Sequence, residues 1–280
     1  MKKRLLAMMA VLALALGAGF AVGCGDDDDD DGSTTGGGGE DLGLITDGQL
    51  LVGTDAPFPP FEIGTPPDIS GYDIDVMDAI AEKIGVDVTY QDTGFDTIFR
   101  DTANGQFDTA AAATTVTPDR QKKVNFTDPY YEAQQALLVP EDSDIKTTAD
   151  LGGVIVGTQD GTTGETYANE ETDASEVRGF PEGPDAVAAL ATGQVEAVII
   201  DQPVAVDAVD KQGGVTIVEE IPTMELYGFA VALDNTALLD AMNEALAELK
   251  DDGTLGDLYQ QYFKADPPAS VLEGVTTPAG

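Results

Sequence analysis

Residues Phe107 to Arg120 read F-D-T-A-A-A-A-T-T-V-T-P-D-R. Apart from one Asp and one Thr, the first seven residues are apolar or small, which is typical of a buried strand flanked by helices. Hydroxyl side chains follow, and Thr117-Pro118 indicates a helix N-cap with proline at the first helical position. Arg120 is therefore expected in the first turn of that helix, beside free backbone N–H groups. Such a place can hold a small anion such as a carboxylate; the alternative is an ordinary surface arginine.

The composition is strongly acidic. The 280 residues include 52 Asp plus Glu against 13 Lys plus Arg, with no His and a formal net charge of −39. This balance argues against nucleic acid or anionic lipid as a partner and favours a solvated, salt-tolerant surface. The lack of His excludes a His-based catalytic triad, and the single Cys excludes an internal disulfide. The length predicts one large or two medium domains.

The N-terminal segment is typical of an exported protein. Basic residues at 2–4 precede an apolar run from Leu5 to Val22, and small residues then lead to Cys24, so a secretory signal is predicted over residues 1–23 in preference to a membrane span. The position of Cys24 resembles the lipobox of bacterial lipoproteins, which implies a lipid anchor to the membrane. The following residues, 24–41, are rich in Asp, Gly, Ser and Thr and predict a disordered acidic tether.

The rest of the chain alternates between strand and helix patterns. Strands are predicted at 50–54, 86–90 and 107–113, with helices beginning near Gly71 and at Phe95 between them. This βαβαβ order predicts a parallel sheet with helices on both faces. The pattern restarts after Tyr131, with strands at 136–139, 154–156, 195–200 and 227–233, a helix at 184–191, and two closing amphipathic helices.

One internal echo supports two similar lobes. Residues 104–110, N-G-Q-F-D-T-A, match residues 192–198, T-G-Q-V-E-A-V, as a helix end, Gly-Gln, an acidic position and a strand. Convergent turn chemistry is the alternative explanation.

Several motifs together resemble the bacterial extracellular solute-binding proteins of family 3, the amino-acid receptors of ABC importers. They occur in the family's order between about residues 49 and 264: Gly53-Thr54-Asp55, Pro60-Phe61-Glu62, Gly71-Tyr72-Asp73-Ile74-Asp75-Val76, Thr115-Val116-Thr117-Pro118-Asp119-Arg120, Phe126-Thr127 and Gly161-Thr162-Thr163.

The resemblance implies a two-lobed α/β fold, the periplasmic-binding-protein fold. Each lobe would be a mostly parallel sheet with helices on both faces, and two crossover strands would form the hinge. Lobe 1 would comprise residues 42–131 and 226–266, lobe 2 residues 132–225, and residues 267–280 a flexible tail. The amino acid would bind between the lobes.

The resemblance also implies roles for single residues. Arg120 matches the clamp on the ligand's α-carboxylate, with the hydroxyl and amide of Thr115 beside it. The backbone carbonyl of Ala113 would accept from the α-ammonium, and Asp201 would pair with that ammonium from lobe 2. Thr162 and Thr163 match the second lobe's contacts to the carboxylate. Phe58 and Phe95 match the two faces that sandwich the ligand's side chain. Asp55 and Gln159 match the positions that read the tip of that side chain.

Simpler interpretations exist for several of these residues. Thr162 and Glu165 have the spacing of a capping box, so Thr162 can cap a helix. Asp201 precedes Gln202-Pro203 and could be an ordinary N-cap. The two phenylalanines could be plain core, and Asp55 could bond its own loop.

Counting charges indicates the ligand class. A zwitterion needs one cation and one anion, which Arg120 and Asp201 supply, and Asp55 leaves one acid over. We therefore expect a polar amino acid with a donor or cation at its tip: glutamine, arginine, lysine or histidine.

The expected function is that of a substrate-binding protein outside the cytoplasm, in the periplasm or on the outer face of the membrane. It would act as a monomer without cofactor, metal or catalysis, and would deliver its amino acid to an ABC permease. The alternatives are a periplasmic dehydratase of the prephenate or arogenate type, which needs an acid poised in the cleft, and a ligand-sensing domain.

Overall fold

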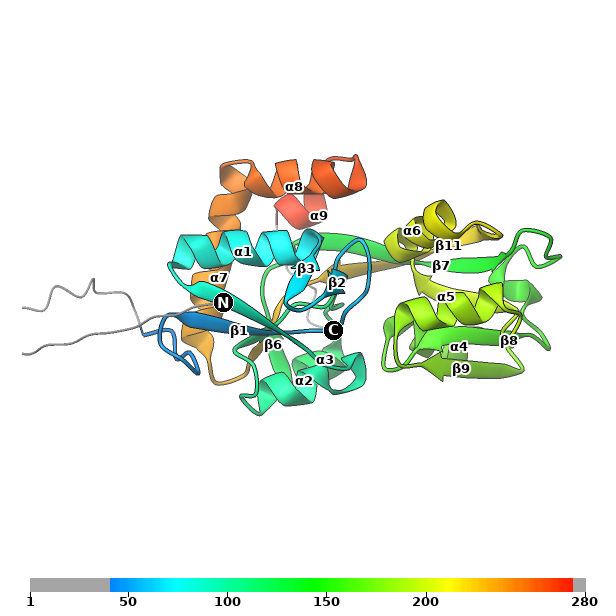
Figure 1. Ribbon diagram of the computed structural model, residues 1–280, viewed down its shortest axis with the longest axis horizontal. Helices are drawn as coiled ribbons and strands as arrows, with labels where there is room; N and C mark the ends of the chain where they lie inside the picture. The colour runs from blue at the N-terminus through cyan, green and yellow to red at the C-terminus, as the bar shows by residue number, and fades with distance from the viewer. Residues whose placement is uncertain (1–40, 274–280) are drawn as a thin grey trace, which may run out of the picture. The chain divides into compact units, whose positions relative to one another are not determined.

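The computed structural model describes residues 41–273 (Figure 1). The predicted signal, Cys24 and almost all of the predicted tether lie outside the described residues, as do residues 274–280. Within 41–273, no helix is both long enough and apolar enough to cross a membrane.

The first of two five-stranded sheets has the order β4-β1-β5-β12-β6. Its strands are β4 (Asp87–Asp92), β1 (Gln49–Thr54), β5 (Thr109–Ala110), β12 (Ala230–Ala232) and β6 (Val124–Phe126). Strands β4, β1 and β5 are parallel, whereas β12 runs antiparallel to both of its neighbours.

The second sheet has the order β11-β7-β10-β8-β9. Its strands are β11 (Val215–Tyr227), β7 (Tyr131–Pro140), β10 (Ala197–Asp201), β8 (Ile155–Gln159) and β9 (Glu176–Phe180). Strands β10, β8 and β9 are parallel, and β7 is antiparallel to β10 and β11. Both sheets are therefore mixed, with a parallel part extended by antiparallel strands.

Helices cover both faces of the sheets. In β10, Val198 and Ile200 belong to one core cluster and Ala197 and Ile199 to another, so alternate side chains are buried on opposite faces. The helices are α1 (Tyr72–Ile84), α2 (Phe95–Ala103), α3 (Pro118–Gln121), α4 (Thr163–Glu171), α5 (Gly183–Ala191), α6 (Gln202–Gln212), α7 (Thr236–Asp251), α8 (Thr254–Phe263) and α9 (Ala269–Leu272), with a 3₁₀ turn at Thr148–Asp150 and a hairpin of β2 (Ile63–Thr65) and β3 (Asp68–Ser70).

Two long strands connect the two halves of the molecule. In Figure 1, β7 runs from the half that holds the first sheet to the other half, and β11 runs back. The two strands pair antiparallel, with Tyr131 opposite Tyr227 at the end near the first sheet. Aromatic rings pack around this start, among them Phe61, 5.0 Å from the ring of Tyr131 and 5.3 Å from that of Tyr227. We call each sheet with its helices a lobe. The two-lobed α/β fold with two crossover strands is confirmed; the exact lobe boundaries stay a prediction.

The strand predicted at 107–113 is much shorter in the structure. Only Thr109–Ala110 forms β5, because Ala113 has φ 45°, in the left-handed region, and the chain turns away from the sheet there. The backbone N–H of Ala113 donates to Oδ2 of Asp73 at 2.8 Å, which replaces the lost strand pairing. The turn brings Ala113 and the residues after it to the end of the sheet.

The prediction of a flexible tail from Pro267 is wrong for the part that the structure describes. Helix α9 occupies Ala269–Leu272, and Val271 is fully buried in the main core cluster. Ser270 also donates a hydrogen bond to Glu132 of β7. Two adjacent apolar residues, Val271 and Leu272, after a pair of prolines form too short a pattern to predict this docking.

We predict that Val271→Ser lowers the free energy of unfolding by about 1–3 kcal/mol, because it leaves a hydroxyl and a small void in the core. Leu272→Ser is the matched control, since Leu272 is 45% exposed, and should change stability by less than about 0.5 kcal/mol. Urea denaturation of both variants measures this. Equal, negligible effects would show that α9 is not docked in solution.

Candidate functional site

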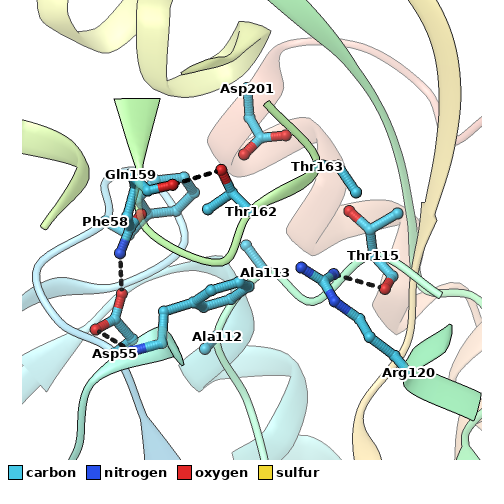
Figure 2. Close-up of a pocket in the computed structure, with 11 residues that line it drawn as sticks. Asp55, Phe58, Ala112, Ala113, Thr115, Arg120, Gln159, Thr162, Thr163 and Asp201 are labelled. Carbon is cyan, nitrogen blue, oxygen red and sulfur yellow. Dashed lines mark hydrogen bonds between the residues drawn. The ribbon is translucent and has the colours of Figure 1, made fainter. Parts of the chain in front are cut away.

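One pocket gathers all ten residues predicted to contact a ligand. It lies where the strands of both sheets end (Figure 2). Its lining residues are Asp55, Phe58, Phe95, Ala112, Ala113, Thr115, Arg120, Gln159, Thr162, Thr163 and Asp201. Only Ala112 was missed, and a small apolar residue inside an alanine run gives no chemical signal. Ligands commonly bind beyond the carboxyl ends of strands in α/β folds.

Arg120 is buried at one end of the pocket. Thr117 caps α3 by accepting from the backbone N–H of Arg120 at 3.2 Å, which fixes where the side chain starts. The guanidinium donates from Nη1 to the carbonyl oxygen of Thr115 at 2.8 Å and from Nη2 to that of Gly161 at 3.1 Å, so it contacts both lobes. Only 8% of Arg120 is exposed, which excludes the alternative of a surface arginine.

Two aromatic rings lie beside this guanidinium. Its central carbon is 4.7 Å from the ring centroid of Phe99 and 5.1 Å from that of Phe95, within cation–π range. Burial lowers the pKa of Arg120 to about 10, while the nearby carboxyls of Glu225 and Asp201 act in the opposite direction. Arg120 is therefore a fixed cation at neutral pH.

Asp201 lies at the end of β10, where α6 begins. It occupies the N-cap position, but its side chain makes no capping hydrogen bond. Its Oδ1 instead accepts from Nε2 of Gln135 at 2.7 Å. Burial, reinforced by the charge of Glu225, raises the pKa of Asp201 to about 7. The carboxyl is thus available to the pocket, and a cation beside it would restore its charge.

Asp55 lies at the end of the pocket opposite Arg120, directly after β1 (Figure 2). Oδ1 accepts from the backbone N–H of Phe95 at 3.1 Å, and Oδ2 from Nε2 of Gln159 at 2.6 Å. Its partners therefore come from α2 and β8 and not from its own loop. Burial, followed by the charge of Glu182, raises the pKa of Asp55 to about 7.

The two phenylalanines are both core residues and pocket walls. Phe58 and Phe95 are 6% and 7% exposed, and each belongs to a core cluster while lining the pocket. Phe58 also approaches the backbone of α5 so closely that a Cβ at Gly183 would lie 2.8 Å from its ring. The two interpretations offered by the sequence are therefore compatible.

The threonines of the second lobe have different partners. Thr162 caps α4, because its hydroxyl accepts from the backbone N–H of Glu165 at 3.1 Å and donates to the carbonyl of Gln159 at 2.8 Å. Thr163 instead donates from its hydroxyl to Oε2 of Glu225 at 2.7 Å. The capping interpretation of Thr162 is thus realised at the edge of the pocket.

Two buried carboxyls behind the pocket were not identified as part of the site from the sequence. Asp73 holds the N–H of Ala113 and accepts from the hydroxyl of Tyr130 at 2.7 Å, and burial raises its pKa to about 6. Glu225 is 6% exposed and accepts from the hydroxyl of Thr115 at 2.6 Å. A glutamate in the apolar run that ends β11 is the signal that could have found Glu225.

This fold and pocket define a two-lobed solute-binding protein. The chain belongs to the bacterial extracellular solute-binding proteins, family 3, whose sequence pattern matches residues 50–265.

Similar proteins extend over most of the chain. The glutamine-binding protein of an ABC transporter from Bacillus subtilis strain 168 is 30% identical over 271 residues, covering 93% of this chain and 99% of the relative. An ancestral arginine-binding protein solved with glutamine bound is 39% identical, with a TM-score of 0.75, and covers 79% of this chain and 100% of that one. An ancestral amino-acid-binding protein described as a precursor of cyclohexadienyl dehydratase is 37% identical, with a TM-score of 0.72, and covers 77% and 96%.

The raised pKa values predict how stability depends on pH without ligand. The folded protein binds protons at Asp55 and Asp201 up to about pH 7, whereas an unfolded Asp releases them near 3.8. These two groups therefore lower the free energy of unfolding as the pH rises from about 4 to 7. The double variant Asp55→Asn/Asp201→Asn should make this slope smaller, leaving the part due to other raised acids such as Asp73, and should be more stable at pH 8, by on the order of 1 kcal/mol per pKa unit.

Urea denaturation at pH 5 and pH 8 measures the effect. Asp144→Asn, at an exposed position, is the control and should keep the wild-type pH dependence. A double variant with an unchanged slope would contradict the raised pKa values.

Proposed function

We propose that this protein is the extracytoplasmic receptor of an ABC importer and binds a free polar amino acid between its lobes. The observation that carries the proposal is the buried guanidinium of Arg120, which lies in the same pocket as two carboxyls. Asp201 shares its end of the pocket, and Asp55 lies at the other end. The protein would be monomeric, need no cofactor or metal and be lipid-anchored through Cys24, in the periplasm or on the outer face of the membrane.

The head of an amino acid fits the end of the pocket that holds Arg120 and Asp201. A guanidinium has five N–H donors, and Arg120 uses two of them on backbone carbonyls in the described part of the chain. The remaining donors can bind a carboxylate, in charge-assisted hydrogen bonds worth roughly 1.5–3 kcal/mol each. Asp201 and the carbonyl of Ala113 would receive the α-ammonium.

The far end of the pocket favours a side chain that donates or carries positive charge. Asp55 is buried there with a raised pKa, and Glu182 and Asp92 both contribute to that rise. A guanidinium or ammonium tip would relieve the repulsion among these carboxyls, and an amide tip could donate to Asp55. Gln159 would complete the reading of the tip, and the rings of Phe58 and Phe95 would hold the stem. Relatives that bind arginine and glutamine support this class.

Closure of the two lobes would be the signal to the permease. Arg120 already contacts carbonyls of both lobes, and a ligand that bonds to both lobes stabilises the closed state by its differential affinity. We infer that binding and delivery, without chemistry on the ligand, are the whole activity.

A dehydratase is the alternative, and one observation favours it. Asp55 faces the pocket with a pKa of about 7, which suits a general acid near neutral pH. A single assay for turnover of prephenate and arogenate by the wild type decides between the two, and we expect no product above the uncatalysed rate.

We predict that calorimetric titration of the purified protein detects binding of arginine, lysine, histidine or glutamine. Arg120→Ala should weaken that binding at least about a hundredfold, because two or more charge-assisted hydrogen bonds to the ligand's carboxylate are lost. Arg100→Ala is the control, since the Arg100 side chain is 64% exposed and pairs with Asp101. Binding only of glutamate or aspartate would overturn the proposed ligand class.

Asp55→Asn tests the reading of the side-chain tip. The variant keeps the shape of the carboxyl but loses its charge, so affinity for arginine should fall about tenfold or more while that for glutamine changes less. Titrations with both ligands at pH 8, where Asp55 can ionise beside a cation, measure the ratio. A variant that loses both ligands equally would place Asp55 in the structure of the pocket and not in its selectivity.

A further inference from the structure

Glu225 is a buried carboxylate that bonds to the pocket without lining it. Oε2 accepts from the hydroxyls of Thr115 at 2.6 Å and Thr163 at 2.7 Å. Oε1 accepts from Nε2 of Gln135 and from the hydroxyl of Thr223, both at 2.9 Å. Four donors therefore occupy the roughly four acceptor positions of one carboxylate.

These bonds determine what the two threonines offer the pocket. A hydroxyl has a single proton and two lone pairs. Thr115 and Thr163 donate their protons to Glu225, and Thr163 also accepts from Nε2 of Gln135 at 3.3 Å. Only the remaining acceptor lone pairs are therefore available to a ligand. Thr115 comes from the first lobe and Thr163 from the first turn of α4 in the second, and both line the pocket with Asp201.

We propose that Glu225 is a positioning residue that makes the space between Thr115, Thr163 and Asp201 an acceptor-only subsite, beside the donors of Arg120, and so selects an α-ammonium over an α-hydroxyl. The inference rests on the proposed function. An ammonium has three donors and no acceptor, which matches Asp201, the two hydroxyl oxygens and the carbonyl of Ala113. A 2-hydroxy acid has one donor and leaves these acceptors unpaired, which is costly when they are buried. The carboxylate then binds to Arg120, and the hydroxyls of Thr115 and Thr163 bind the ammonium instead of the carboxylate that the family resemblance implied for them.

Glu225→Gln should reverse the threonine hydroxyls. The new amide has one oxygen and one NH₂. Gln135 presents its NH₂ to Glu225, Asp201 and the hydroxyl of Thr163, and an NH₂ can only donate. In this orientation of Gln135 the new oxygen faces Gln135. The new NH₂ then faces Thr115 and Thr163, whose hydroxyls must accept from it and turn their protons into the pocket.

The experiment compares each of L-arginine and L-glutamine with the 2-hydroxy acid that carries the same side chain. In Glu225→Gln, the affinity ratio of amino acid to hydroxy acid should fall about tenfold or more from the wild-type value. Glu219→Gln is the matched control on the same strand, because Glu219 accepts from the backbone N–H of Thr148; its ratio should stay at the wild-type value. Melting temperatures establish that each variant is folded.

Thr115→Val and Thr115→Ser test the inference independently, also if Glu225→Gln fails to fold. Valine removes the acceptor and should lower the ratio, whereas serine keeps the hydroxyl and should preserve it. Equal losses for amino acid and hydroxy acid in Glu225→Gln and Thr115→Val would assign Glu225 a merely structural role. If the wild type binds an amino acid and the ratio does not move, this inference alone fails; if the wild type binds none, the proposed function fails with it.

Discussion

The burial of one guanidinium constrains the arrangement of the whole pocket. A cation without compensation inside a protein is strongly unfavourable, and Arg120 is compensated by backbone carbonyls from both lobes and by the carboxyls of Asp201 and Glu225. The short helix α3 follows the point where the chain leaves β5, and its N-cap Thr117 fixes where the side chain of Arg120 begins. The close approach of the lobes and the position of this charge therefore depend on each other.

The carboxyls around the pocket outnumber the guanidinium. Asp201 and Asp55 have pKa values raised to about 7 because each is buried beside another acid. The folded protein thus carries an electrostatic strain that a positively charged guest would relieve at either end. A net acidic pocket in a chain of formal charge −39 also favours the approach of cations over anions.

The resemblance to family 3 allowed the ten contact positions to be placed, whereas the hydrogen bonds that join them depend on long-range pairing. Local patterns alone, the strand end and the Thr117-Pro118 cap, indicated only an anion site at Arg120. The bond from Gln159 to Asp55 joins residues 104 positions apart, and that from Thr115 to Glu225 joins residues 110 apart. Nothing local encodes such bonds. The shortening of β5 at Ala113 likewise depends on Asp73, which is 40 positions away.

The second crossover strand, β11, both connects the lobes and carries Glu225. Its pairing with β7 shifts register between Ile221 and Glu225. An irregularity of this kind re-aims the side chains that follow it, and here the residue that follows is Glu225, bonded to a hydroxyl of each lobe. If the lobes close as proposed, bending of β11 would also move the carboxylate that orients those hydroxyls. Closure and the proposed preference for a donor-rich ligand head would then both act through the side chain of Glu225.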